Sequence, residues 1–268
     1  MKTRTEFDSM GAVEVPAEHR WGAQTQRSFE NFRIGTQKQP LAVIHAFAHL
    51  KAACAMANME HGLITPEQAE TICAVCKEIA DGRWDSEFPL VVWQTGSGTQ
   101  TNMNVNEVIA HLAAERGVKL HPNDDVNRSQ SSNDTYPTAM YIAAVTELEE
   151  KLIPSCEALA ASFAALEARY PDIIKIGRTH LQDAVPLRFA QEVSGWRRSV
   201  EAPCGMIKTA LPELKKLAVG GTAVGTGLNA PAGYDECVCG HLNKLLGSDF
   251  TPDRNKFHAL TSLSLIHI

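Results

Sequence analysis

The feature that most constrains this chain is a succession of long helical segments in its second half. Alanine and leucine dominate these segments, and their spacing favours helices rather than strands. We predict helices at residues 138–152, at 156–170 after a break or kink at Pro154, at 189–217 with an interruption at Pro203, and at 234–246, ending at Gly247. Helices of this length bury their apolar faces against one another, so the pattern predicts a helical bundle.

Shorter helices are expected in the first half of the chain. The sharpest signal is Thr65-Pro66-Glu67-Gln68, a capping box with proline at the first helical position. Apolar residues then recur at helical spacing as far as Ala80, and Gly82 provides a left-handed C-terminal cap. Two further helices are predicted at residues 41–59 and 105–116. Because alternating strand patterns are scarce, we predict a mainly α fold.

Composition and charge exclude several classes of protein. The 268 residues are 44% apolar, which is ample for a buried core and excludes a disordered or fibrous chain. Asp and Glu total 31 against 25 for Lys and Arg, so the net charge of -6 predicts no attraction to nucleic acid or anionic membranes. The first residues lack an apolar signal region, and no stretch approaches the roughly 20 apolar residues of a membrane span. We therefore expect no nucleic-acid or membrane partner and a cytoplasmic location.

The cysteines indicate a reducing compartment, because there are seven of them and their scattered spacing is not that of a disulfide framework. Cys73 and Cys76 match a redox or zinc half-site, but no second cysteine or histidine pair follows at ligand spacing. We interpret both as core residues. Cys237 and Cys239 receive the same interpretation, since residues two apart on a helix do not face each other. The sequence therefore predicts no metal site.

Four polar, glycine-containing loops interrupt the helical pattern, at residues 94–106, 121–133, 177–183 and 220–229. Binding and catalytic residues concentrate on such loops. The first loop contains Ser97, Gly98 and Thr99 directly before a helix, where free backbone N–H groups and the positive helix end can receive a carboxylate. An ordinary glycine turn with an N-cap is the alternative interpretation.

The second loop gathers hydroxyl, amide and imidazole groups on one short segment. His121-Pro122-Asn123-Asp124 stands at its start and Ser131-Ser132-Asn133 at its end. A dicarboxylate needs hydrogen-bond donors at both of its ends, and this segment supplies them. The serines and the asparagine also suit the N-cap of the next helix, and we expect capping to be part of their role.

The third loop contains His180, whose ordinary pKa of about 6.5 suits proton transfer near neutrality. A lone histidine is more often structural, and its spacing alone does not make it catalytic. The fourth loop is rich in glycine, and phosphate binding is the alternative for it. It lacks the Gly-Lys-Ser/Thr ending of a phosphate-binding loop.

Together and in this order, the four loops resemble those of the fumarase and aspartase superfamily, and within it the class II fumarases. The likeness runs from about Asp8 to about Leu260. Two motifs resemble fumarases more than the related ammonia lyases: Gly-Arg-Thr-His-Leu-Gln-Asp-Ala at 177–184 and Gly-Ser-Gly-Thr-Gln at 96–100. The resemblance implies an N-terminal lyase domain at residues 1–130, followed by a central helical bundle domain at 131–268.

The resemblance also implies an activity, the reversible hydration of fumarate to (S)-malate without a metal or an organic cofactor. It implies a homotetramer whose active sites draw residues from several subunits. His180 matches the family's proton donor and acceptor on the hydroxyl side, acting through a bound water. The matching substrate-binding residues are Ser97, Gly98, Thr99, Ser131, Ser132, Asn133 and Thr179, and a second dicarboxylate site matches His121, Pro122, Asn123 and Asp124. Val118 stands where family members often carry a basic residue.

The chain departs from the family pattern in one respect that concerns catalysis. The family takes its C3 base from a serine in the pattern Gly-Ser-Ser-x-Met-Pro-x-Lys-x-Asn, which these 268 residues do not contain. The sequence after about Leu260 also differs from the expected continuation. We therefore expect a truncated or mis-joined frame, inactive by itself.

Two alternatives stand beside the hydratase. The first is an aspartate ammonia-lyase on the same fold, and the turn around His180 argues against it. The second is a non-catalytic fragment that binds a dicarboxylate or associates with full-length subunits, and the absence of the serine loop supports it.

Overall fold

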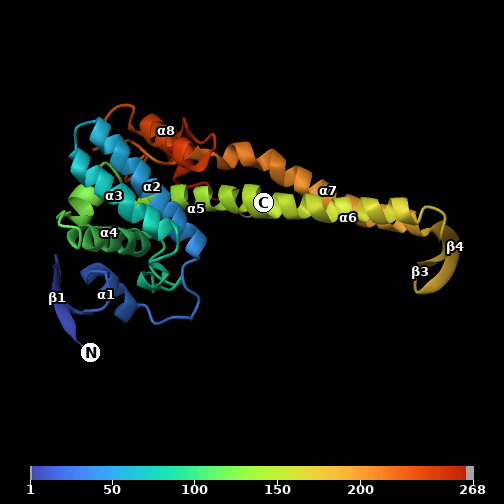
Figure 1. The fold of residues 1–268 in the computed structure, drawn as a ribbon, viewed down its shortest axis with the longest axis horizontal. Coiled ribbons are helices and arrows are strands. Elements are labelled where there is room, and N and C mark those ends of the chain that lie inside the picture. Colours follow the sequence, from blue (N-terminus) through green and yellow to red (C-terminus); the bar gives the residue numbers. More distant parts are fainter. Residues whose placement is uncertain (1, 264–268) are drawn as a thin grey trace. The chain divides into compact units, whose positions relative to one another are not determined.

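The structure is a computed structural model that describes residues 2–263, and helices dominate it (Figure 1). Its chain divides into two compact units, which are described separately. Among the described residues, unit 1 comprises 2–143 and 214–263, and unit 2 comprises 144–213. The mainly α fold class predicted from the sequence is confirmed.

The described part of unit 1 contains a set of helices and two pairs of short strands. The hairpin β1–β2 is antiparallel, from Thr3 opposite Pro16 to Asp8 opposite Gly11, whereas β5 and β6 pair in parallel. The elements in chain order are β1 (Thr3–Asp8), β2 (Gly11–Pro16), α1 (Ala23–Asn31), α2 (Leu41–Glu60), α3 (Pro66–Ala80), η1 (Asp85–Glu87), α4 (Thr99–Ala114), η2 (Pro122–Val126), most of α5 (Ser132–Glu147), β5 (Lys216–Leu217), α8 (Tyr234–Leu246), β6 (Thr251–Pro252) and α9 (Lys256–Ala259).

Helix α2 lies at the centre of unit 1, where it packs against α3, α4 and α8. Ile44, Phe47 and Leu50 are fully buried, and so are residues on its other faces, as is typical of a core helix. By length and hydropathy α2 also reaches the level of a membrane-spanning helix, which we did not expect from the sequence. The structure buries 67% of that stretch inside the unit, so its apolar character is used in the core.

The ends of α3 and α4 show what local sequence can and cannot specify. The capping box is confirmed: Thr65 Oγ1 accepts from Gln68 N–H at 3.2 Å, and Gln68 Oε1 accepts from Thr65 N–H at 2.9 Å. Helix α4, however, begins at Thr99 rather than at residue 105. Its first two turns carry hydroxyl and amide side chains of low helix propensity, and buried tertiary hydrogen bonds stabilise them instead.

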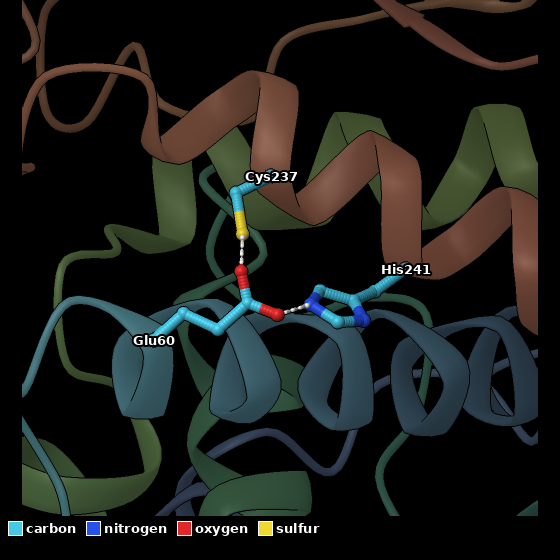
Figure 2. A group of neighbouring side chains, drawn as sticks. All are labelled: Glu60, Cys237 and His241. Atoms are coloured by element: carbon cyan, nitrogen blue, oxygen red, sulfur yellow. Dashed lines mark hydrogen bonds and ion pairs between the residues drawn. The ribbon is translucent and has the colours of Figure 1, made fainter.

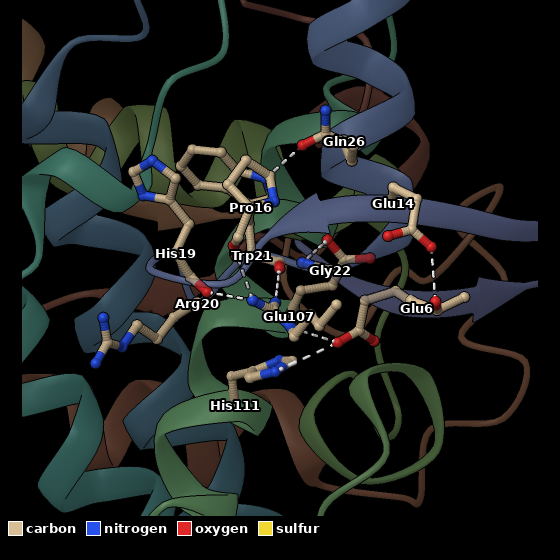
Figure 3. Close-up of polar contacts among 12 residues, drawn as sticks. Glu6, Glu14, Pro16, His19, Arg20, Trp21, Gly22, Gln26, Glu107 and His111 are labelled. Atoms are coloured by element: carbon tan, nitrogen blue, oxygen red, sulfur yellow. Dashed lines mark hydrogen bonds and ion pairs between the residues drawn. The ribbon is translucent and has the colours of Figure 1, made fainter. Parts of the chain in front are cut away.

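Glu107 of α4 connects the N-terminal segment to the core of unit 1 (Figure 3). Its Oε2 accepts hydrogen bonds from the backbone N–H groups of Gly22 at 3.0 Å and Thr25 at 3.1 Å, and its Oε1 accepts from Gln24 at 2.9 Å. Gly22, the N-cap residue of α1, has no side chain for this purpose, so a carboxylate from another helix caps α1. Burial raises the pKa of Glu107, whereas these hydrogen bonds act to lower it.

Unit 2 is built around two long helices that lie side by side and are joined by a hairpin (Figure 1). Arg197 Nε donates to Glu167 Oε1 at 2.7 Å, and the rings of Phe163 and Trp196 lie 6.2 Å apart, centroid to centroid. The elements are η3 (Leu148–Leu152), α6 (Ile153–Arg169), the antiparallel hairpin β3 (Ile174–Thr179) and β4 (Gln182–Arg188), and most of α7 (Phe189–Leu214).

The interruption predicted at Pro203 is wrong, whereas the break predicted near Pro154, the predicted helix at 234–246 and its left-handed cap at Gly247 are confirmed. Pro154 lies in the first turn of α6, where a missing N–H leaves no bond unmade, and the π-helical turn η3 joins α5 to α6. Pro203 lies inside α7. Arg197, before Pro203, and Lys208, after it, both form ion pairs with α6. These contacts keep α7 packed against α6 on both sides of the proline.

Candidate active site

A cavity of about 640 Å³ in unit 1 brings two of the predicted carboxylate-binding segments together. Ser97 precedes α4, Asn133 lies in the first turn of α5, and both line this cavity. Ala223 and Val224 of the glycine loop line it as well. Two helix N-termini therefore meet at one cavity, and their free N–H groups and positive ends favour an anion there.

The segment before α4 presents two hydroxyl groups beside a glycine that cannot be replaced without a clash. Gly98 is the N-cap of α4 with a φ of 70°, and a Cβ there would lie 2.3 Å from Cγ of Tyr136. Ser97 Oγ and Thr99 Oγ1 are 2.9 Å apart. Ser97 Oγ also lies 3.3 Å from Thr95 Oγ1, so when Ser97 donates to Thr99 the hydroxyl hydrogen of Thr99 is the one left for a carboxylate oxygen.

The segment before α5 combines capping with exposed donors. The predicted capping role is confirmed for Ser131, whose Oγ accepts from Asn133 N–H at 3.2 Å. Asn133 is exposed, and its Nδ2 donates to the carbonyl of Ala223 at 2.8 Å, which ties the glycine loop to α5. Ser132 is half-buried, and its Oγ accepts from Asn102 at 3.0 Å.

Two buried residues that we did not single out from the sequence join these segments. Asn102 Nδ2 donates to Asn127 Oδ1 at 3.2 Å and to Ser132 Oγ at 3.0 Å. Lys51 Nζ donates to Asn127 Oδ1 and to Gln130 Oε1, both at 2.9 Å. Burial lowers the pKa of Lys51 to about 8. The signal for Lys51 was present in the sequence, because it is the one charged residue in the apolar stretch from 41 to 59.

Asp134 was also missed, and it connects two backbone segments of the site, the N-cap of α5 and the glycine loop. Its Oδ1 accepts from Ser131 N–H at 2.9 Å, and its Oδ2 accepts from Gly220 N–H at 3.1 Å and Thr222 N–H at 2.9 Å. Burial raises the pKa of this carboxyl to about 6, against the lowering effect of the three N–H donors. An acid three residues after a serine N-cap is the sequence signal that marks it.

The residues predicted to form a second dicarboxylate site lie at η2. His121 Nδ1 accepts from Asp124 N–H at 3.1 Å and so caps this turn. His121, Pro122 and Asn123 line a cavity of about 680 Å³. Asn123 and Asp124 line another, of about 700 Å³, together with Ser131. The four residues are thus close together, with Asn123 common to both cavities.

Thr179 and His180 belong to unit 2, at the hairpin of β3 and β4. Thr179 pairs with Gln182, so His180 and Leu181 form a two-residue turn, and the polar turn predicted around His180 is confirmed. Both turn residues have positive φ, 49° and 62°, which matches a type I′ turn. His180 is exposed. The structure thus gathers Ser97 and Asn133 in unit 1 and displays His180 on a tight turn of unit 2.

Backbone strain in the described chain concentrates in the predicted loops. The non-glycine residues with positive φ are Ser129, His180, Leu181, Thr222 and Asn229. All five fall inside three of the four loops that the sequence marked for chemistry. A left-handed backbone is costly for branched side chains such as those of Leu181 and Thr222, and such strain clusters at functional sites.

The helical fold is shared with solved structures of lyases. A sequence profile of the lyase family matches residues 11–266, and the chain belongs to this family. It is 52% identical over 268 residues to the class II fumarate hydratase of Bacillus subtilis. The matched region covers 98% of this chain and 58% of that protein. With the class II fumarate hydratase of Thermosynechococcus vestitus it shares 54% identity over 267 residues, 97% of this chain and 57% of that one.

Solved structures give the same relationship. The crystal structure of recombinant class II fumarase from Schistosoma mansoni superimposes with a TM-score of 0.93 and 42% identity, over 96% of this chain and 59% of that chain. The chain therefore spans a little under three-fifths of the length of these relatives.

Proposed function

We propose that this chain carries the substrate-binding and acid–base part of a fumarate hydratase, which reversibly adds water to fumarate to give (S)-malate. The observation that carries the proposal is the meeting of Ser97 and Asn133 at one cavity, each at the N-terminus of a helix. A dicarboxylate of four carbons needs a concentration of N–H and O–H donors at each carboxylate, and this cavity offers them. The relatives named class II fumarate hydratase support the choice of substrate.

In this proposal the donors of both segments bind substrate carboxylates. Ser97, Gly98 and Thr99 receive one carboxylate at the start of α4, and Ser131, Ser132 and Asn133 act at the start of α5, with Thr179 completing the set. When the C3 proton of malate is removed, negative charge spreads onto the adjacent carboxylate. Fixed donors and helix N-termini stabilise that charge more strongly than they stabilise the ground state. We place the second dicarboxylate site at His121, Pro122, Asn123 and Asp124.

His180 supplies the acid for the departing hydroxyl in this proposal, through a bound water. Its exposed position on a strained two-residue turn leaves both ring nitrogens free of protein hydrogen bonds within the described residues. A histidine side chain can serve as a general acid and as a general base in such a reaction. The C3 base is the serine of the family pattern that these 268 residues lack. The proposal therefore includes a complete, homotetrameric and cytoplasmic enzyme, with domains at 1–130 and from 131 onward, to which this chain contributes.

The test uses a completed chain, in which a C-terminal part of a class II fumarate hydratase carrying the serine loop is joined after Leu260. Fumarate absorbance is followed with malate as substrate, and in parallel with aspartate. We expect turnover of malate and none of aspartate by the completed chain, and no turnover by the 268 residues alone. Turnover of aspartate would instead identify an ammonia-lyase, and turnover by the 268 residues alone would show that a complete site exists without the serine loop.

His180→Asn in the completed chain separates binding from chemistry. We expect kcat to fall by roughly 10²–10⁴-fold, the usual contribution of general acid–base catalysis, with KM nearly unchanged. His61→Asn is the matched control, because His61 is exposed as well and lies outside the four loops. A His180→Asn enzyme with near-parental kcat would remove this residue from the mechanism.

A further inference from the structure

Outside the four loops, three side chains of different chemistry converge where α2 ends beside α8 (Figure 2). Cys237 Sγ donates to Glu60 Oε2 at 3.1 Å, and His241 Nε2 lies 3.0 Å from Glu60 Oε1. The sulfur, the imidazole nitrogen and the carboxylate oxygen all lie within 4.8 Å of one another. In the part of the chain that the structure describes, this is the one group of three such ligands at that spacing.

The arrangement follows from helix geometry and explains why the sequence did not suggest it. Cys237 and His241 are four residues apart on α8, so they lie on the same face one turn apart. Cys237 and Cys239, two residues apart, point to different sides of α8, so the partner of Cys237 on its own helix is His241. The third residue, Glu60, is 177 positions from Cys237 and reaches the pair only through the packing of α2 against α8.

Thiolate, imidazole and carboxylate are the ligands that Zn²⁺ accepts in proteins. With metal–ligand bonds of about 2.0–2.3 Å, the donor atoms of a tetrahedral site lie roughly 3.3–3.7 Å apart. The donor atoms here are 3.0 and 3.1 Å apart in the two contacts with Glu60. A rotation of the Glu60 and Cys237 side chains opens the remaining few tenths of an ångström. Glu60 is largely exposed, so this adjustment disturbs no core packing and leaves room for a water as fourth ligand.

The electrostatic setting of Glu60 also favours a cation. Glu60 is the last residue of α2, where the unpaired carbonyl groups give the helix end a partial negative charge. A carboxylate at this end is repelled by the helix dipole, and a bound cation relieves that repulsion. Lys244 acts in the opposite direction, because it lies near enough to influence both Glu60 and Cys237.

We propose that Glu60, Cys237 and His241 form a zinc site with three protein ligands and one water. On binding, Cys237 coordinates as the thiolate and its proton passes to solvent. The metal joins the C-terminus of α2 to α8, the helix that follows the glycine loop, and its role is to stabilise this packing. The site stands apart from the proposed hydration chemistry, which needs no metal, and its existence does not depend on that function.

The test uses the untagged 268-residue chain, freed of metal with a chelator and then supplied with Co²⁺ or Zn²⁺. We expect about one Zn²⁺ per chain by elemental analysis, and for Co²⁺ the near-ultraviolet absorption of a cobalt–thiolate bond. Cys237→Ser should abolish that absorption, and Cys237→Ser or His241→Ala should weaken zinc binding roughly tenfold or more in competition with a chromophoric chelator. Lys244→Gln, which removes a like charge, should tighten binding.

Cys156→Ser and His258→Ala are the matched controls, because each removes the same ligand type at an accessible position away from the cluster. Both should bind zinc as the parent does. Circular dichroism checks that every variant retains its helices, and a zinc-dependent rise in the melting temperature provides an independent readout. The proposal is overturned if the cobalt–thiolate absorption survives Cys237→Ser, or if the parent binds zinc no more tightly than the Cys237→Ser/His241→Ala double variant.

Discussion

Asn102→Ala tests whether a buried amide holds the two carboxylate-binding segments together. The side chain of Asn102 is fully buried. Its Nδ2 donates to Asn127 Oδ1 at 3.2 Å and to Ser132 Oγ at 3.0 Å, and its Oδ1 accepts from Thr135 Oγ1 at 3.2 Å. A neutral hydrogen bond contributes a net 0.5–1.5 kcal/mol, so three of them sum to roughly 1.5–4.5 kcal/mol of folding free energy.

Truncation also leaves a cavity, and a matched variant removes that contribution from the comparison. Asn106 lies one turn later on α4 and is fully buried as well. Its Nδ2 has only a weak contact with Met103 Sδ at 3.6 Å, and its Oδ1 has no hydrogen-bond partner among the described residues. Asn106→Ala therefore deletes the same atoms from a similar environment but breaks almost no hydrogen bonding.

Urea denaturation of both variants in the completed chain, followed by circular dichroism, measures the difference. We expect Asn102→Ala to be less stable than Asn106→Ala by roughly 1.5–4.5 kcal/mol. Affinity for a dicarboxylate inhibitor should fall only with Asn102→Ala, because only that change releases Ser132. A difference in unfolding free energy of less than about 0.5 kcal/mol would refute the role assigned to this network.

Three further predictions concern the same unit. Thr99→Val and Asn133→Ala should each weaken dicarboxylate binding by roughly 1.5–3 kcal/mol in calorimetry, because each removes a donor to a charged group, and unchanged affinity in both would displace the site. Burial raises the pKa of Asp134 from 3.8 to about 6, so the stability gained from its protonated form is complete below about pH 4 and is lost as the pH rises through 6. Between pH 4 and 7 the unfolding free energy of the parent should therefore fall by roughly 2 kcal/mol relative to that of Asp134→Asn, at 1.36 kcal/mol per pH unit over most of this range. Thr65→Ala should cost about 1 kcal/mol of stability in denaturation, since it removes the N-cap acceptor of α3, whereas Thr261→Ala, which lies in no capping box, should change little.

The parts of the fold that could be predicted are those encoded by neighbouring residues. The capping box at Thr65 and the left-handed cap at Gly247 need only a few consecutive side chains, and both were predicted correctly. The continuation of α7 through Pro203 could not be predicted, for the opposite reason. Whether Pro203 ends a helix depends on contacts with a second helix 30 or more residues away in the sequence, such as the Arg197–Glu167 pair.

The candidate site likewise contains residues that the local sequence marks and residues that it does not. Ser97, Asn133 and His180 stand in loops whose polar, glycine-rich composition marks them in any reading of the sequence. The role of Asn102 could not be predicted from neighbouring residues, because its three hydrogen-bond partners follow it by 25 to 33 positions in the sequence. The start of α4 at Thr99 could not be predicted for a related reason. Its first turns consist of polar residues that are helical only because tertiary hydrogen bonds stabilise them.

Asp134 imposes a rule on anyone who wishes to redesign this cavity. Its single carboxylate serves the N-cap of α5 and two N–H groups of the glycine loop, 86 and 88 positions further along the chain. Both loop contacts are made by backbone N–H groups, so changes of loop side chains preserve them unless proline is introduced at position 220 or 222. A change of Asp134 to an apolar residue, by contrast, removes the contacts with the N-cap and with the loop together, so position 134 is the one to keep fixed while the loop is varied.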